Sequence, residues 1–185
     1  MDAPIETETK FPIDSWRVWE EALNRQGAML VTARHFERNT LFDDQRGSLF
    51  HQGYTLRLRE VPAGGYLTLK GPPRQIGPIK EREELESEVA KPAVCEQIFL
   101  KLGFVPTFQY EKYRAIYRLD KTTITLDEVP IGFFIEIEGN AEMISTAASR
   151  LGLDLGTATP LSYVRLYTLA RQNDPSLPEF MVFSK

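Results

Sequence analysis

The chain has 185 residues, of which 42% are hydrophobic and 26% charged, and its formal net charge is −4. These values are ordinary for one globular domain. The acidic balance argues against a nucleic-acid partner, which would require a broad basic surface. Every apolar run is shorter than the roughly 20 residues that span a bilayer, so we expect a cytoplasmic protein that does not bind membranes. The single cysteine, Cys95, excludes an internal disulfide and is expected to be a packing residue.

The first half of the chain is typical of strands interrupted by one helix. Residues 5–11 alternate as a strand does, and Pro12 followed by apolar residues at helical spacing, including Trp16 and Trp19, predicts a helix that ends at Gly27. Further extended segments are expected at 28–42, 54–60 and 66–70, followed by a long charged segment at 78–89.

The second half repeats this mixture of strands and helices. Strands are expected at 104–119, 122–129 and 133–138, and helices at 92–102, 141–151 (with Asn140 as N-cap) and 161–170. Short turns between consecutive strands favour an antiparallel sheet with helices packed outside, which is an α+β fold. We expect one domain over residues 1–172 and a tail over 173–185, in which residues 180–183 are apolar enough to dock.

Charge alternates along these strands in an unusual way. Side chains two residues apart share one face of a strand. Glu6, Glu8 and Lys10 share such a face, and Arg57 and Arg59 share another. For each strand alone, a solvated face is the simpler interpretation. Helices must cover the apolar faces, however, so the charged faces would turn toward one another, and about eight strands close into a barrel that holds its own side chains or one small ligand.

The expected lumen contains two sets of charges. The cationic set is Lys10, Arg57, Arg59, Lys70, Arg82, Lys112 and Arg114. The carboxylate set is Glu6, Glu8, Glu84, Glu86, Asp127, Glu136 and Glu138. Arginine and lysine suit phosphate oxygens, whereas carboxylates suit Mg²⁺ or Mn²⁺. We therefore expect the cations to bind a triphosphate and the carboxylates to bind a divalent metal.

A series of charged segments resembles the CYTH family, which includes class IV adenylate cyclases, thiamine triphosphatases and inorganic triphosphatases. The segments are 6–10 (E-x-E-x-K), 56–59, 67–71, 82–86, 111–114, and Asp127 with 136–138. The resemblance covers roughly residues 5–170, is closest in layout to the class IV cyclase-like members, and implies an eight-stranded triphosphate tunnel. Leu41 stands where the thiamine triphosphatases have tyrosine, which counts against a thiamine-specific substrate.

The activity that we expect is metal-dependent hydrolysis of inorganic or nucleoside triphosphate, with tripolyphosphate or ATP as the small-molecule partner. A class IV adenylate cyclase that converts ATP to cyclic AMP and pyrophosphate is an alternative, and a noncatalytic polyphosphate-binding module is another. Lys10 or Lys70, with a pKa lowered by neighbouring cations, is the candidate base, although both could simply hold phosphate. No zinc-like spacing involves His35 or His51, Arg165 is a candidate for the tunnel mouth, and a homodimer is left open.

Overall fold

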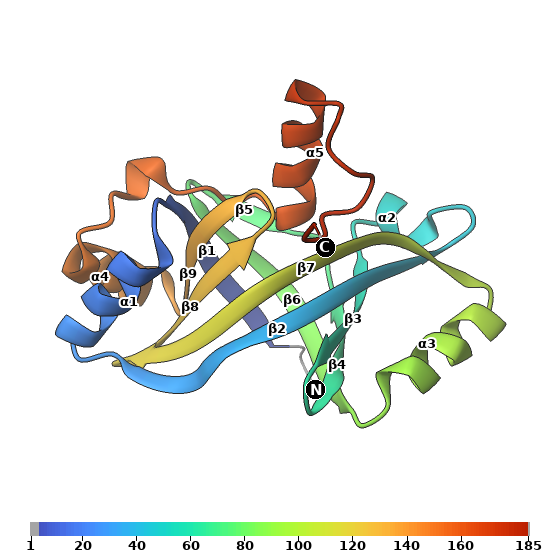
Figure 1. Ribbon diagram of the computed structural model, residues 1–185, viewed down its shortest axis with the longest axis horizontal. Helices are drawn as coiled ribbons and strands as arrows, with labels where there is room; N and C mark the ends of the chain where they lie inside the picture. The colour runs from blue at the N-terminus through green and yellow to red at the C-terminus, as the bar shows by residue number, and fades with distance from the viewer. Residues whose placement is uncertain (1–3, 185) are drawn as a thin grey trace.

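The computed structural model describes residues 4–184 and contains one antiparallel sheet that closes on itself (Figure 1). The strands are β1 (Ile5–Ile13), β2 (Met29–Asp44), β3 (Thr55–Val61), β4 (Gly64–Lys70), β5 (Arg74–Ile76), β6 (Ile79–Val89), β7 (Phe104–Leu119), β8 (Thr122–Val129) and β9 (Gly132–Glu138). Their order is β1-β9-β8-β7-β2-β3-β4-β6-β5, and β1 also pairs with β6. Eight strands therefore form a closed barrel, with β5 as an extra strand beside β6, which confirms the predicted fold class.

The helices lie outside the barrel (Figure 1). They are α1 (Trp16–Arg25), α2 (Ser48–His51), α3 (Pro92–Lys101), α4 (Ala141–Leu151) and α5 (Tyr163–Asn173), with a short 3₁₀ turn, η1 (Leu155–Thr157), before α5. The predicted cap of α4 is present, because the Asn140 side chain accepts a hydrogen bond from the Met143 amide. Within residues 4–184, no helix combines the length and the apolar character needed to cross a membrane.

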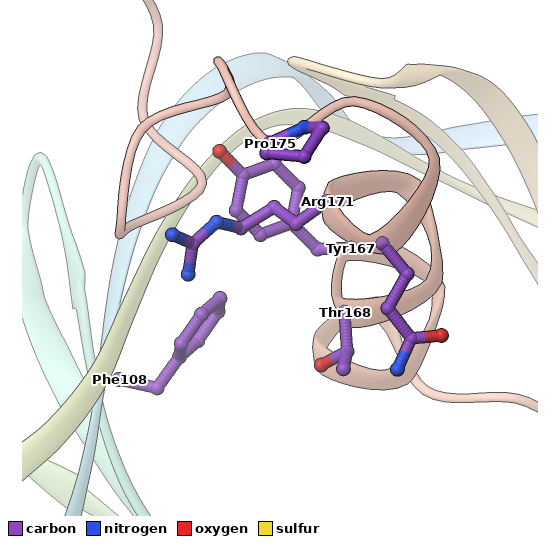
Figure 2. Close-up of a pocket in the computed structure, with 6 residues that line it drawn as sticks. Phe108, Tyr167, Thr168, Arg171 and Pro175 are labelled. Carbon is purple, nitrogen blue, oxygen red and sulfur yellow. The ribbon is translucent and has the colours of Figure 1, made fainter.

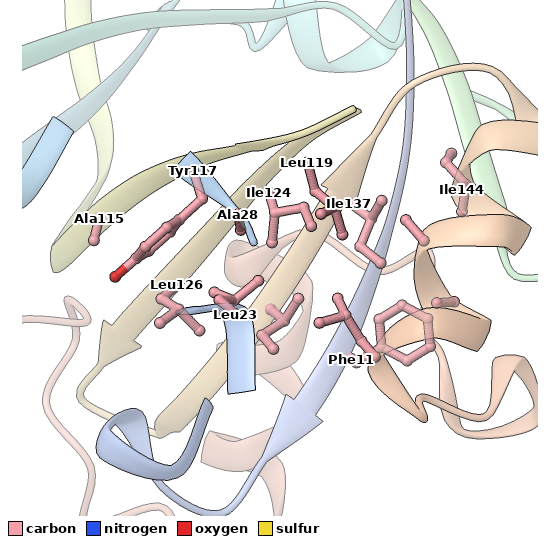
Figure 3. Close-up of a cluster of buried hydrophobic side chains, with 14 residues drawn as sticks. Phe11, Leu23, Ala28, Ala115, Tyr117, Leu119, Ile124, Leu126, Ile137 and Ile144 are labelled. Atoms are coloured by element: carbon pink, nitrogen blue, oxygen red, sulfur yellow. The ribbon is translucent and has the colours of Figure 1, made fainter. Parts of the chain in front are cut away.

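The main hydrophobic core lies between the outward face of the barrel and helices α1 and α4 (Figure 3). Strand residues such as Phe11, Ile124 and Ile137 meet Leu23 of α1 and Ile144 of α4, and all five are fully buried. Burial of each such side chain contributes about 1.5–3 kcal/mol. Trp16 and Trp19 pack against this cluster. The apolar side chains of the alternating strands thus point outward toward the helices, and the charged side chains point into the barrel.

A second cluster joins α5 and the C-terminal segment to the barrel. Met181 is fully buried, and its backbone exchanges hydrogen bonds with β7: the Glu111 amide donates to the Met181 carbonyl, and the Met181 amide donates to the Gln109 carbonyl. Strand β8 pairs with β7 only from Tyr113 onward, so the C-terminal segment covers the edge that β8 leaves free. Residues 1–3 and 185 lie outside the described range, and the division into residues 1–172 and 173–185 stays a prediction.

Several boundaries differ from the predicted ones. Pro12 does not begin the first helix; it extends β1 opposite Phe134, and α1 begins at Trp16. Strand β6 accompanies β1 only as far as Glu8, so a residue without an N–H group is tolerated at this edge. The last helix begins at Tyr163 rather than Leu161, because the Ser162 side chain accepts from the Arg165 amide and caps it.

Helix α2 was not predicted, and it depends on a contact that the local pattern does not show. The Asp43 carboxylate accepts hydrogen bonds from the backbone amides of Leu49 and Phe50, each at 2.9 Å. This side chain folds the segment after β2 into a short helical turn. The three-residue strand β5 was not predicted either, since Gly71-Pro72-Pro73 obscures the pattern before it.

We predict that Met181→Ala lowers the free energy of unfolding by about 2–5 kcal/mol, because it leaves a cavity between the C-terminal segment and β7. Chemical denaturation of the full chain measures this change. The matched control is Phe50→Ala, which removes a ring that is 76% exposed and should change stability by no more than about 0.5 kcal/mol. Equal effects of the two substitutions would show that residues 180–183 do not pack on β7.

Candidate functional site in the barrel lumen

The strand register places every charged residue of the two predicted sets on the inward face of the barrel. In each pair of strands, inward residues of one strand lie opposite inward residues of the other. Glu6 is opposite Arg82, for example, and Lys10 is opposite Glu136. Among the described residues, ion pairs connect all of these side chains except Arg82 and Glu138. The tertiary structure therefore gathers residues from distant parts of the chain into one charged lumen.

One group of ion pairs in this lumen is centred on Asp127, which is 0% exposed. Its carboxylate accepts from Arg114 Nε at 2.7 Å, from Lys112 Nζ at 3.2 Å and from the Tyr163 hydroxyl at 2.7 Å. Glu136 lies beside it and forms ion pairs with Lys10 and Arg114, both at 2.5 Å. Burial alone would raise the pKa of Glu136, but Lys10 and Arg114 hold it well below its usual range. Hydrogen-bond donors and cations of the protein therefore already contact the carboxylates of both Asp127 and Glu136.

A second group of ion pairs joins β3, β4 and β6 to Glu6 of β1. Lys70 Nζ is 2.6 Å from Glu6 Oε2 and 3.1 Å from Glu84 Oε2. Glu86 accepts from Arg59 at 2.8 Å and from the Thr68 hydroxyl at 2.8 Å. These contacts fill the lumen with alternating charges, so a negatively charged guest would have to compete with carboxylates for the same cations.

Carboxylates without enough counter-charge gather around β1. Burial, together with Glu8 and Glu84, raises the pKa of Glu6 to about 7 despite the neighbouring Lys70. Glu138 lies at the exposed end of β9, and partial burial of its carboxyl, together with Glu8 and Glu84, raises its pKa as well. Glu8 itself is buried, but lysines including Lys10 and Lys80 lower its pKa to about 2. The repulsion felt by Glu6 and Glu138 is the kind that a bound cation would relieve.

The donor set at this end fits a divalent cation by its chemistry, because Mg²⁺ and Mn²⁺ prefer carboxylate oxygens. Glu6, Glu8 and Glu138 are the residues that fit best, because Glu6 and Glu138 have raised pKa values and Glu8 lies opposite Glu138. Arginine, in contrast, holds both Asp127 and Glu136. In the described part of the chain, no group of three or more His, Cys, Asp or Glu side chains is already arranged to hold a metal ion. Metal binding would therefore require Glu6 and Glu8 to leave their ion pairs with Lys70 and Lys80.

The pKa of Lys10 differs from the prediction. Burial lowers the pKa of this amine, but Glu136 and Glu8 outweigh burial and raise it above the ordinary value. Its Nζ also lies 4.4 Å from the centre of the Tyr163 ring. The predicted lowering by neighbouring cations is wrong for Lys10, because the nearest charges are carboxylates. The protonated amine suits the alternative role, which is to hold phosphate.

Several buried polar atoms of the lumen have no hydrogen-bond partner in residues 4–184. They are Glu37 Oε2, both amide atoms of Asn39, Nε of Arg57, Arg59 and Arg82, and Nη2 of Arg82. Most of these atoms are donors. Burial lowers the pKa of the Arg82 guanidinium, although Glu6 and Glu8 oppose this effect. Buried polar groups are nearly always paired in folded proteins, so donors left open in one place indicate a guest rich in acceptors.

Some residues of the lumen were not predicted. Glu37 and Asn39 occupy alternate inward positions of β2, and Lys80 forms an ion pair with Glu8; the period-two pattern could have identified all three. Glu37 is buried between Lys112 and Arg59. Tyr163 could not have been found in this way, because it enters the lumen from helix α5. Arg165, proposed from the sequence for the tunnel mouth, is exposed on α5.

A pocket of about 260 Å³ lies outside the ion pairs, between α5 and β7 (Figure 2). Figure 2 shows Arg171 of α5 reaching toward Phe108 of β7, with Tyr167 and Pro175 nearby. Arg171 is the only charged residue in its lining, which contains no carboxylate. The interlinked charges make the lumen, and not this pocket, the candidate functional site.

The protein is thus a tunnel-type β-barrel: its antiparallel sheet is closed, its interior is charged and its helices lie outside. Residues 4–149 match the family described as the CYTH domain. The chain therefore belongs to the CYTH family, as the charged segments of the sequence predict.

The chain is also similar to individual archaeal proteins. A protein of Methanocaldococcus jannaschii that is named as a candidate adenylate cyclase is 31% identical over 136 residues, which are 72% of this chain and 76% of that protein. The solved structure of the PH1012 protein of Pyrococcus horikoshii has a TM-score of 0.73 at 25% identity, over 87% of this chain and 98% of that one.

Two solved structures of lower identity share the fold. A candidate adenylate cyclase of Vibrio parahaemolyticus has a TM-score of 0.79 at 19% identity, over 90% of this chain and 99% of that one. The adenylyl cyclase candidate HpAC1 of Hippeastrum has a TM-score of 0.69 at 18% identity, over 89% of this chain and 96% of that one.

We predict that Asp127→Asn lowers the free energy of unfolding by about 3–5 kcal/mol, because it leaves the buried Arg114 and Lys112 without their shared carboxylate. Thermal and chemical unfolding measure the change. The control is Glu138→Gln, which removes a carboxylate that forms no ion pair within residues 4–184 and should not destabilise the protein. A stable Asp127→Asn variant would contradict the view that this carboxylate holds the lumen together.

Proposed function

We propose that the protein is a metal-dependent triphosphatase that hydrolyses inorganic or nucleoside triphosphate inside the barrel. The observation that carries this proposal is the set of unpartnered buried donors on Arg57, Arg59 and Arg82. A triphosphate is a compact chain of acceptor oxygens with several negative charges. Guanidinium groups match such oxygens in charge and in geometry.

Guest binding would exchange partners within the lumen. Lys70 is held by Glu6 and Glu84, and Arg59 is held by Glu86 and Glu37. Phosphate oxygens that take over these cations would leave carboxylates without counter-charge. Glu6, Glu8 and Glu138 would then hold a divalent cation, which supplies charge neutralisation at the phosphate oxygens. The two sets of charges thus favour a triphosphate and a cation together over either one alone.

The chain's own residues would act mainly by position and charge. Water attacks the terminal phosphorus and gives up a proton to the surrounding solvent, the bond from that phosphorus to its bridging oxygen breaks, and the remaining diphosphate leaves with the electron pair. Arg57, Arg59 and Arg82 would stabilise the negative charge on the phosphate oxygens, and protonated Lys10 would add a further positive contact. Phosphoryl transfer depends mostly on such electrostatic stabilisation.

The relatives support two chemistries for this fold. HpAC1 of Hippeastrum is described as having a dominant triphosphatase activity, which is a precedent for hydrolysis. The name of the Methanocaldococcus jannaschii relative favours the second candidate, an adenylate cyclase. In that reaction the ribose 3′-hydroxyl attacks the α-phosphorus and pyrophosphate leaves. The same cations could serve both reactions, which differ in the phosphorus that faces the nucleophile.

Product analysis distinguishes these reactions. The full chain is incubated with tripolyphosphate, ATP or thiamine triphosphate, each with Mg²⁺ or Mn²⁺, and the products are identified. We expect orthophosphate from tripolyphosphate or ATP, and slower turnover of thiamine triphosphate. Formation of cyclic AMP and pyrophosphate would show that the protein is an adenylate cyclase instead. Binding of a triphosphate without any turnover would show that it is a noncatalytic binding module.

We predict that Glu6→Gln and Glu8→Gln each lower metal-dependent turnover by about 100-fold or more while the protein stays folded, because each removes a carboxylate that would hold the cation. Steady-state rates and circular dichroism are the measurements. Glu21→Gln is the control, since Glu21 forms an exposed ion pair with Arg17 on α1. Near-normal rates in both lumen variants would show that β1 does not hold the metal.

A further inference from the structure

Asn39 of β2 is a buried side chain that the two sets of charges do not involve. It is 0% exposed, and the register places it opposite Arg59 of β3 on one side and Tyr110 of β7 on the other. Neither Oδ1 nor Nδ2 of its carboxamide has a hydrogen-bond partner in residues 4–184. A buried amide left unpaired lowers stability, so its presence calls for a compensating role.

The surroundings indicate what Asn39 could contact. Arg57 and Arg59 on the adjacent strand β3 each have an unpartnered buried Nε. Together with Asn39 Nδ2, these atoms form a row of open donors on the β2–β3 wall. The nearest inward carboxylate along β2, Glu37, already pairs with Lys112 and Arg59. The complement of this wall is therefore a group with several acceptor oxygens, such as a phosphate.

Asn39 also lies at a change in polarity along the lumen. Successive inward pairs on β2 and β7 are Glu37 with Lys112, Asn39 with Tyr110, and Leu41 with Phe108. Inward positions on a strand are about 6.6–6.8 Å apart. On β2 and β7 the wall thus passes within a few steps from charged, through neutral polar, to apolar, while Arg57 of β3 lies opposite Leu41. Asn39 therefore lies beside the open donors of β3 and at the edge of the apolar part of the wall.

We propose that Asn39 is a further substrate-contacting residue of the tunnel. Its Nδ2 donates to a phosphate oxygen of the guest that Arg59 also holds. Its Oδ1 accepts from an O–H group beside the phosphate chain, which belongs either to a water molecule or to a sugar hydroxyl. This inference rests on the proposed binding of triphosphates, but it does not depend on which reaction follows.

The test compares wild type with Asn39→Leu, a variant of similar size that removes both amide groups. Calorimetric titration with tripolyphosphate and with ATP, in the presence of Mg²⁺, should show affinities that are lower by about tenfold to 100-fold, the range for losing a hydrogen bond to a charged group. The melting temperature of the free variant should be equal to or higher than that of wild type, because an unpaired amide is gone. A second variant, Asn39→Asp, places a negative charge beside the phosphate and should weaken binding further.

The two ligands distinguish the sources of the O–H group. An equal loss of affinity for tripolyphosphate and ATP identifies a water molecule, whereas a larger loss for ATP identifies a sugar hydroxyl. Thr122→Val is the control, since the Thr122 hydroxyl is buried, faces away from the lumen and donates to the Leu119 carbonyl at 2.7 Å. This control should lose stability and keep wild-type affinity, which is the reverse of the Asn39→Leu result.

Failure of this inference differs from failure of the proposed function. Wild-type affinity of Asn39→Leu for both ligands would overturn the contact even if hydrolysis occurs. Lower affinity of the variant, without turnover by wild type, would support the contact and overturn hydrolysis. If wild type binds neither ligand, both proposals are wrong.

Discussion

The barrel depends on the pairing of opposite charges across a closed and mostly buried lumen. Asp127 illustrates the constraint: it is fully buried and accepts from Arg114, Lys112 and Tyr163 at once. Buried charges are strongly destabilising when one partner is missing. The strand register must therefore bring cations and carboxylates together, and the eight-stranded ring does so by closing β1 against β6.

The same pairing makes the lumen responsive to a guest. Lys70 lies between Glu6 and Glu84, and Arg59 lies between Glu86 and Glu37, so these cations are already shared between acceptors. A triphosphate offers a further set of acceptors, and the carboxylates that it displaces suit a divalent cation. Arg82 points the same way, because its Nε and Nη2 are buried without a hydrogen-bond partner among the described residues.

Outside the lumen, apolar packing against the outward face of the barrel stabilises the closed sheet. Helices α1 and α4 cover the outward face of β1, β7, β8 and β9, and the C-terminal segment covers the free edge of β7. Helix α5 connects the outside to the site, because Tyr163 reaches from it to Asp127 while Tyr167 packs in the cluster with Met181. The position of α5 is therefore coupled to the charges of the lumen.

The sequence by itself determined the closed barrel and the inward sets of charges, because period-two alternation in Glu6-Thr7-Glu8 or Arg57-Leu58-Arg59 reports directly which face a side chain occupies. Tertiary structure decided the partners. The pKa of Lys10 is raised by Glu8, which precedes it on the same face of β1, and more strongly by Glu136, which only the pairing of β1 with β9 places opposite it. Tyr163 and the unpaired Asn39 likewise depend on elements far apart in the chain: a helix that enters the lumen, and two neighbouring strands whose side chains leave the amide open. Alternation specifies a face of a strand, whereas charge pairing and hydrogen bonding depend on distances that exist only once the strands are paired and helix α5 is packed against the barrel.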